Sequence, residues 1–262
     1  MAQEPVQVGR QEEQMDWGRA KTVLIAAFLL LNIILGYQLW MDIRDQAQSN
    51  LDIASLSENA QRALEDKHIQ VNAQIPRDTP ILGPIPYRDL TPINSEPIQL
   101  KRAADSQLIF NEDELKEQLS TEIPQFSNYQ YDSLIAEEGV FVMHPLINND
   151  LPLFNMNLEL YYSNQKIHSY LAPQLTLQQE EADEPRQEIL SASTALGTII
   201  EHDLPEGAVV KDITLGYYGQ NTGDHTTVAL PVWRIALESG AFYYVQGISG
   251  EVIVAPSSQN EE

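Results

Sequence analysis

The sequence contains no cysteine. This absence excludes disulfide bonds, thiolate nucleophiles and cysteine-based zinc sites, and it suits a domain that folds outside the cell without oxidative help. Basic residues are also scarce, with 15 lysines and arginines against 38 aspartates and glutamates. Because a chain with a net charge of −23 repels phosphate backbones, nucleic acid is not expected as a partner.

Recognisable catalytic and cofactor motifs are lacking as well. There is no glycine-rich phosphate loop, and the sequences SNQK at 163–166 and GISG at 247–250 only partly resemble nucleophile motifs. The histidines are scattered without the spacing of a metal site; they are His68, His144, His168, His202 and His225. We therefore expect a protein that is not an enzyme, with no catalytic residues, no metal site and no cofactor.

One long apolar run stands out against these absences. Residues 22–40 are 19 residues without a charged side chain, and as a helix they extend about 28 Å, close to the roughly 30 Å of bilayer hydrocarbon. The run is longer than the core of a cleaved signal, and the bulky Tyr37, Leu39 and Trp40 stand where a cleavage site needs small residues. We predict an uncleaved, single-pass transmembrane helix at 22–40.

The charges beside this run predict its orientation. Three basic residues, Arg10, Arg19 and Lys21, precede it, whereas Arg44 is the only basic residue among the twenty that follow. By the positive-inside tendency, we expect a cytoplasmic tail at 1–21 and an extracellular C-terminal domain on a cell-membrane protein. From residue 41 onward the chain has 34 acidic and 12 basic residues, so anionic lipid would repel this part and only the helix should enter the bilayer.

The hydrophobic pattern after residue 40 predicts an α+β ectodomain of two similar subdomains, each a helix followed by an antiparallel sheet. Helical spacing of apolar residues predicts a stalk helix at 41–67. The first subdomain, 68–178, holds a strand at 68–76, an extended proline-rich segment at 76–97, a helix at 111–124 and strands from 129 to 177. The second, 179–254, holds a helix at 189–205 and then further strands, and 255–262 is predicted to be a disordered tail.

The densest aromatic stretch lies near the C-terminus. If 231–235 is a strand, Trp233 points to one face and Arg234 to the other. Core packing is the favoured interpretation for Trp233, while contact with a partner by Trp233, Arg234, Tyr243 and Tyr244 stays open. Pro231 suggests an edge strand or a bulge.

The apolar run also carries features of a contact surface. Asn32 and Gly36 lie four residues apart on one helix face, beside Phe28 and Leu29. Asparagine in hydrocarbon favours a hydrogen-bonding partner, and glycine allows close approach of a second helix. We predict that these four residues contact a partner transmembrane helix, although an asparagine tolerated in an ordinary anchor remains an alternative.

Several segments resemble the YycI (WalI) family. The N-terminal MDWGRAKTVLIAAFLLLNIILGYQLW resembles the opening of that family, FNMNLELYY at 154–162 its middle strand, and LGYYGQ at 215–220 with PVWRIALESGAFYYVQGISGEV at 231–252 its C-terminal end. The resemblance spans about 15–254. Because family members usually begin near the Met-Asp-Trp sequence, translation from either Met1 or Met15 is compatible with it.

This resemblance implies a membrane-anchored regulator of signalling. Proteins of this family associate with YycH outside the cell and with the transmembrane helices of the sensor histidine kinase WalK in Gram-positive bacteria. They thereby tune phosphorylation of the response regulator WalR, which controls cell-wall metabolism. The expected partners are therefore a YycH-like protein, a WalK-like kinase and the membrane.

A second hypothesis comes from a different class of protein. Strand-rich domains that end in an aromatic hairpin also resemble PepSY-type modules, which bind or inhibit peptidases outside the cell. Under that hypothesis the segment at 22–40 would be a passive tether.

Overall fold

The computed structural model describes residues 21–22, 24–38, 55–92, 94–135, 137–148, 150–178, 186–221 and 227–253. The chain divides into two compact units, 1–48 and 49–262. In the first, residues 24–38 are helical and their side chains are exposed. No helix among the described residues combines the length and hydropathy that a membrane crossing requires. The predicted span at 22–40 includes residues 23, 39 and 40, which lie outside the described set, and it stays a prediction.

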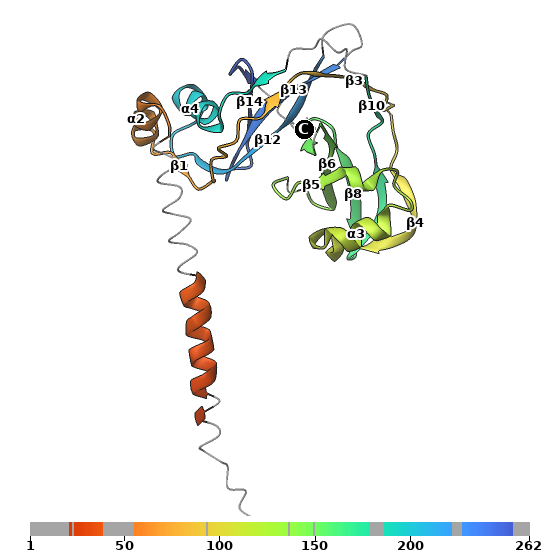
Figure 1. The fold of residues 1–262 in the computed structure, drawn as a ribbon. Helices are drawn as coiled ribbons and strands as arrows, with labels where there is room; N and C mark the ends of the chain where they lie inside the picture. The colour runs from red at the N-terminus through yellow and green to blue at the C-terminus, as the bar shows by residue number, and fades with distance from the viewer. Residues whose placement is uncertain are drawn as a thin grey trace, which may run out of the picture. The chain divides into compact units, whose positions relative to one another are not determined.

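The second unit contains two main sheets, and the larger one forms what we call the large lobe (Figure 1). Its strands follow the order β1, β12, β13, β14, β15, with β3 beside β13 and β10 beside β3. All pairs are antiparallel except β1 with β12. The strand bounds are β1 Gln70–Val71, β3 Ile85–Asp89, β10 Leu175–Leu177, β12 Val209–Asn221, β13 Thr227–Leu237, β14 Phe242–Gln246 and β15 Val252–Ile253.

Two helices pack on the large lobe and share its core. They are α2 Glu58–Asp66 and α4 Ala192–His202, and both begin at a serine whose hydroxyl accepts a backbone N–H, Ser57 from Ala60 and Ser191 from Thr194. The apolar side of α4 meets buried residues of β12, β13 and β14, including Trp233. At the other end of α4, the Lys67 ammonium donates to the backbone carbonyls of Ile200, Glu201 and Leu204 at 2.8, 3.2 and 3.3 Å. A cation at this end also complements the helix dipole.

The smaller sheet, with its helix, forms the small lobe. Its strand order is β4, β9, β8, β6, β5, with β7 beside β6, and all pairs are antiparallel. The bounds are β4 Ile98–Asp105, β5 Tyr129–Tyr131, β6 Val140–Ile147, β7 Leu151–Pro152, β8 Leu158–Ser163 and β9 Lys166–Leu171. The helix α3 Glu112–Leu119 packs here, between the 3-10 turns η1 Ser106–Phe110 and η2 Phe126–Asn128. A separate apolar core fills this lobe.

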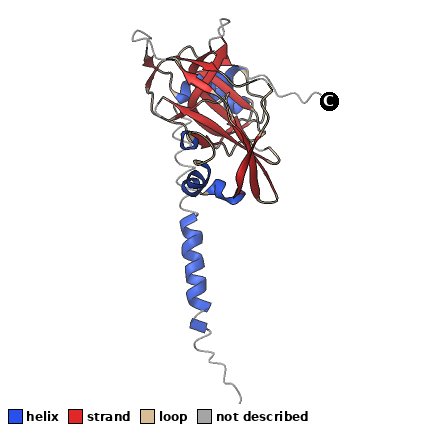
Figure 2. Ribbon diagram, turned by 90° about the vertical axis from the view of Figure 1, so that its right-hand side faces the viewer, coloured by secondary structure: helices blue, strands red, loops and turns tan. Residues whose placement is uncertain are grey.

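These elements confirm an α+β fold with antiparallel sheets, and Figure 2 shows how far strands predominate over helices. In each lobe a helix precedes an antiparallel meander. Asn164 and Gln165 form a tight hairpin turn between β8 and β9, with φ of 48° and 62°. The predicted helix at 189–205 corresponds to the shorter α4; Leu196 and Ile200 within it are buried, and so is Ile189 just before it.

The predicted domain boundaries differ from the structure. The segment expected to be a stalk, 41–67, contains α2, which packs against α4 in the large lobe; residues 41–54 lie outside the described part. The segment expected to open the first subdomain, 68–89, contributes β1 and β3 to the same large sheet. Within it, β2 Ile81–Leu82 pairs with β11 Gln187–Glu188 as a separate two-stranded antiparallel sheet. The described part of the second unit therefore starts in the large lobe, crosses into the small lobe after β3 and returns at β10.

The edge-strand interpretation of Pro231 is wrong, because β13 is a central strand. On one side β13 pairs with β12 along most of its length. On the other it pairs with β3 at residues 227–229 and with β14 at residues 232–236. Pro231 stands between these two neighbours, where one partner strand gives way to the next. The predicted tail at 255–262 and the run at 179–185 lie outside the described residues.

Candidate functional site

Strand β13 sends its side chains to two different environments, as the alternation predicted. Trp233 and Ile235 belong to the core beneath α4, and the Trp233 indole N–H donates to the Leu190 carbonyl at 2.8 Å. Val232 lies on the opposite face with Phe154 and Tyr244. Arg234 lies on that face too, because its guanidinium carbon is 4.3 Å from the centre of the Phe154 ring. This face of β13 meets the small lobe.

The small lobe reaches the large sheet through the segment after β7. The Phe154 N–H donates to the Tyr217 carbonyl at 2.9 Å, and the Asn155 side chain exchanges hydrogen bonds with the backbone of Gly219. Gly216 makes room for this contact, since a Cβ atom there would stand 2.6 Å from the Pro152 carbonyl oxygen and 2.7 Å from Phe154 Cζ. The absence of a side chain on Gly216 therefore lets Phe154 lie against β12.

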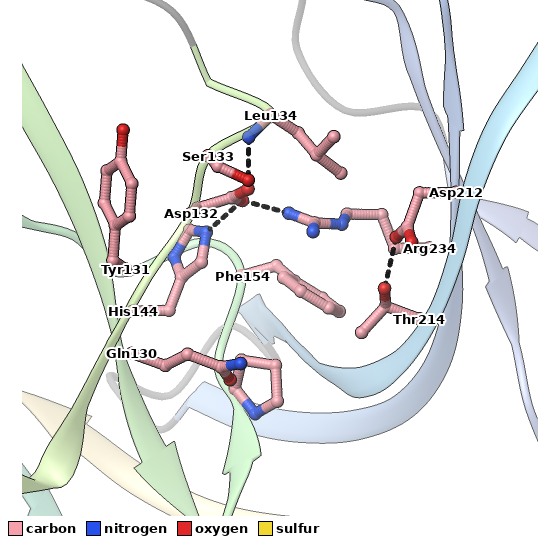
Figure 3. Close-up of a pocket in the computed structure, with 11 residues that line it drawn as sticks. Gln130, Tyr131, Asp132, Ser133, Leu134, His144, Phe154, Asp212, Thr214 and Arg234 are labelled. Carbon is pink, nitrogen blue, oxygen red and sulfur yellow. Dashed lines mark hydrogen bonds and ion pairs between the residues drawn. The ribbon is translucent and has the colours of Figure 1, made fainter. Parts of the chain in front are cut away.

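A buried carboxylate lies beside this contact, just after β5 (Figure 3). Asp132 is 5% exposed, and its Oδ1 accepts the Leu134 N–H at 3.0 Å. Its Oδ2 accepts two further hydrogen bonds, one from His144 Nε2 at 3.0 Å and one from Arg234 Nη1. Burial by itself raises the pKa of Asp132, but the His144 and Arg234 hydrogen bonds and the Arg234 charge outweigh it and hold that pKa far below its usual value. The group is therefore a carboxylate at any ordinary pH.

Arg234 crosses between the lobes to reach this carboxylate. It is 5% exposed and lies between two aromatic rings, Phe154 at 4.3 Å and Phe242 at 5.2 Å. Its Nε atom is buried, and no described residue accepts a hydrogen bond from it. Nearby, burial raises the pKa of Tyr244 to about 12, although the Arg234 charge acts in the opposite direction. Arg234 thus forms an ion pair with Asp132 and cation–π contacts with Phe154 and Phe242.

His144 completes the group, on β6 of the small lobe. Its second ring nitrogen, Nδ1, lies 3.2 Å from the Met156 carbonyl oxygen. Five polar residues are buried within the described ranges, and Asp132, His144 and Arg234 are three of them. We call these three residues the junction cluster. They border a cavity of about 200 Å³ whose lining also includes Ser133 and Thr214.

Both ring nitrogens of His144 are engaged within the small lobe. A histidine that activates a hydroxyl needs one free ring nitrogen directed at it. In His144 one nitrogen faces Asp132 and the other faces the Met156 carbonyl, so neither is directed at the Ser133 hydroxyl. Across the ranges that the structure describes, no three histidine, aspartate or glutamate side chains gather as a metal site would require.

The residues predicted to meet a partner outside the membrane are largely inside the fold. Trp233, Arg234 and Tyr244 are 1%, 5% and 7% exposed, and Tyr243 is half-buried beside the core under α4. Burial of Trp233 agrees with the favoured core interpretation. A partner role for these four residues stays a prediction.

The predicted helix face lies in the first unit and is open. Phe28 and Leu29 are 65% and 57% exposed, and nothing lies within 4 Å of a Cβ atom placed on Gly36. The Asn32 amide donates to the Phe28 carbonyl one turn earlier at 2.8 Å. The four side chains thus share an accessible stretch of helix, and the role of that stretch in partner contact stays a prediction.

Comparison with known proteins places the chain in a family. A search of curated proteins found no match. Among solved structures, an uncharacterized protein from Eubacterium rectale ATCC 33656 covers 72% of this chain and 91% of its own, with 10% identity and a TM-score of 0.45. The Bacillus megaterium YpeB C-terminal domain covers 76% of this chain and 97% of its own, with 9% identity and a TM-score of 0.37. The sequence model described as YycI protein matches residues 85–248, which is more than half of the chain and includes the junction cluster, and the protein therefore belongs to the YycI family.

Proposed function

We propose that this protein is a membrane-anchored, non-enzymatic regulator of a WalK-type sensor kinase, and that it acts with a YycH-like partner to set phosphorylation of the response regulator. The observation that carries this proposal is the family match over 85–248, which covers the small lobe and most strands of the large lobe. The geometry of His144 supports the non-enzymatic part, since both ring nitrogens are already engaged. The family match does not favour the PepSY-like alternative.

In this proposal residues 22–40 span the membrane, with the N-terminus in the cytoplasm and the two lobes outside. The exposed face at Phe28, Leu29, Asn32 and Gly36 meets the kinase. The Asn32 amide bonds within its own helix, so its contribution to a partner would come from rearrangement or from its remaining hydrogen-bonding capacity. An interhelical hydrogen bond of this kind is worth about 0.6–2 kcal/mol.

The test is co-purification of the kinase with a double variant, Asn32→Leu with Gly36→Leu. We expect this variant to recover several-fold less kinase, because it removes the polar group and blocks close approach of the helices. A matched control, Leu30→Ala with Ile34→Ala, changes the opposite side of the same helix and should recover kinase normally. Equal recovery by the double variant and the wild type would remove this face from the proposal.

A further inference from the structure

The junction between the lobes has two halves of different chemistry. One half is an apolar cluster that draws on both lobes: Ile85, Tyr87, Ile147, Leu153, Met156, Tyr217 and Ala229. The other half is the junction cluster, in which Arg234 of the large lobe reaches Asp132 of the small lobe. Each lobe also has its own separate core. Hydrogen bonds from Phe154 and Asn155 to β12 also join the lobes. The lobes could therefore turn about these bonds and the apolar half while the contact from Arg234 to Asp132 opens.

The polar half depends on one shared oxygen atom. Arg234 Nη1 and His144 Nε2 both donate to Asp132 Oδ2. Of these two donors only Arg234 comes from the opposite lobe, whereas His144 and Asp132 both belong to the small lobe. A stronger hydrogen bond from His144 to this oxygen, or added positive charge beside it, therefore weakens the Arg234 contact, which is one of the contacts that join the lobes.

A second proton on the His144 ring would strengthen its hydrogen bonding within the small lobe and would also add positive charge beside Asp132. With one ring proton, His144 donates from Nε2 to Asp132, and its Nδ1 carries no hydrogen. Nδ1 then lies 3.2 Å from the Met156 carbonyl oxygen, and both of these atoms are acceptors, so no hydrogen bond joins them. With two protons, Nδ1 gains a hydrogen bond to that carbonyl, while a second cation shares Asp132 with Arg234 in a buried site where charges are weakly screened. Protonation thus stabilises the small lobe internally and repels the arginine that belongs to the large lobe.

We propose that His144 is a pH-sensitive switch at the contact between the two lobes. When its ring gains a second proton, the contact from Arg234 to Asp132 weakens and the polar half of the junction opens. The other ionisable groups on the elements packed here do not duplicate this effect. Asp212 of β12, which lines the cavity, accepts the Thr214 hydroxyl, and Tyr131 of β5 and Tyr244 of β14 are neutral because burial raises their pKa. His144 is the histidine among the residues that line this cavity, and histidine is the side-chain type that gains a second ring proton under mildly acidic conditions.

The test measures the separation of the lobes in the full chain. Since the protein has no cysteine, Glu138→Cys and Lys211→Cys place one exposed spin label on each lobe. Pulsed electron spin resonance at pH 7.5 should give one short distance, and at pH 5.5 a longer population should grow. One linked proton can change this equilibrium by at most about tenfold per pH unit.

Substitutions at two histidines distinguish a pH response that depends on His144 from a general effect of acid. His144→Asn removes the titratable ring and should abolish the pH response; His144→Gln serves the same purpose if the asparagine variant does not fold. His202→Asn, at a side chain 72% exposed, should keep the response of the wild type. Identical distances at both pH values in the wild type would overturn the proposal, and so would a response that persists without His144.

Discussion

Removal of either partner of the ion pair between Arg234 and Asp132 should destabilise the second unit strongly. Each is 5% exposed, and an uncompensated buried charge costs about 3–5 kcal/mol. Arg234→Met leaves Asp132 with two of its three donors, His144 and Leu134, so we expect about 3 kcal/mol. Asp132→Asn leaves Arg234 without a carboxylate between its two aromatic rings, so we expect about 5 kcal/mol.

The double variant should be less damaged than the two single variants together. With both charges gone, no buried ion lacks its partner, and we expect the double variant to recover about 2–3 kcal/mol of the summed loss. Domains of this kind have a total stability of about 5–15 kcal/mol, so all three losses are measurable where the wild type exceeds about 6 kcal/mol.

Urea unfolding of the full chain measures these energies. The chain has three tryptophans, so Trp17→Phe and Trp40→Phe leave Trp233, which is 1% exposed, as the fluorescent reporter of the large lobe. Strictly additive losses, within about 0.5 kcal/mol, would mean that the two side chains do not interact and would refute the ion pair as the contact that joins the lobes.

Three further predictions test other parts of the fold. Gly216→Ala should lower the free energy of unfolding in urea by about 1–3 kcal/mol, because the new methyl group collides with Phe154. Gly197→Ala in α4 should be neutral or stabilising by up to about 1 kcal/mol, because the nearest atom to the new methyl group is 3.4 Å away. Lys67→Met should lower the thermal stability by about 1–2 kcal/mol through loss of the bonds to the end of α4, and an unchanged melting temperature would contradict that role. The pKa of Tyr244 is about 12 in the folded state against 10 when unfolded, so its contribution to stability is fully present below pH 10 and is lost as the pH rises to 12. Tyr244→Phe should therefore flatten the fall in stability between pH 10 and 12, which unfolding curves at alkaline pH will measure.

Elements with strong local signals were predictable from the sequence. Helix α4 has a serine N-cap and one apolar side, and the hairpin has at Asn164 a residue that readily adopts the left-handed conformation. The faces of β13 followed from simple alternation around Trp233. In each case the decisive information lies within a dozen neighbouring residues.

The lobe boundaries and the junction cluster were not predictable in this way. The packing partner of α2 is α4, more than a hundred residues later in the chain, so α2 looked like an independent stalk. Asp132, His144 and Arg234 come from three separate parts of the chain with no characteristic spacing, and sequence spacing does not distinguish His144 from the other four histidines. One signal was present: His144 and Arg234 are polar residues flanked by apolar residues within their strands, and a buried charge needs a partner.

The central claim, regulation of a kinase through the helix at 22–40, is tested most directly by a membrane two-hybrid assay. The full chain and a chain with 22–40 replaced by an unrelated anchor are each paired with the WalK-like kinase and with the YycH-like protein. We predict that the full chain binds both, and that the replaced chain keeps the YycH-like partner through its extracellular lobes but loses the kinase. Undiminished binding of the kinase by the replaced chain, or binding of neither protein by the full chain, would contradict the account.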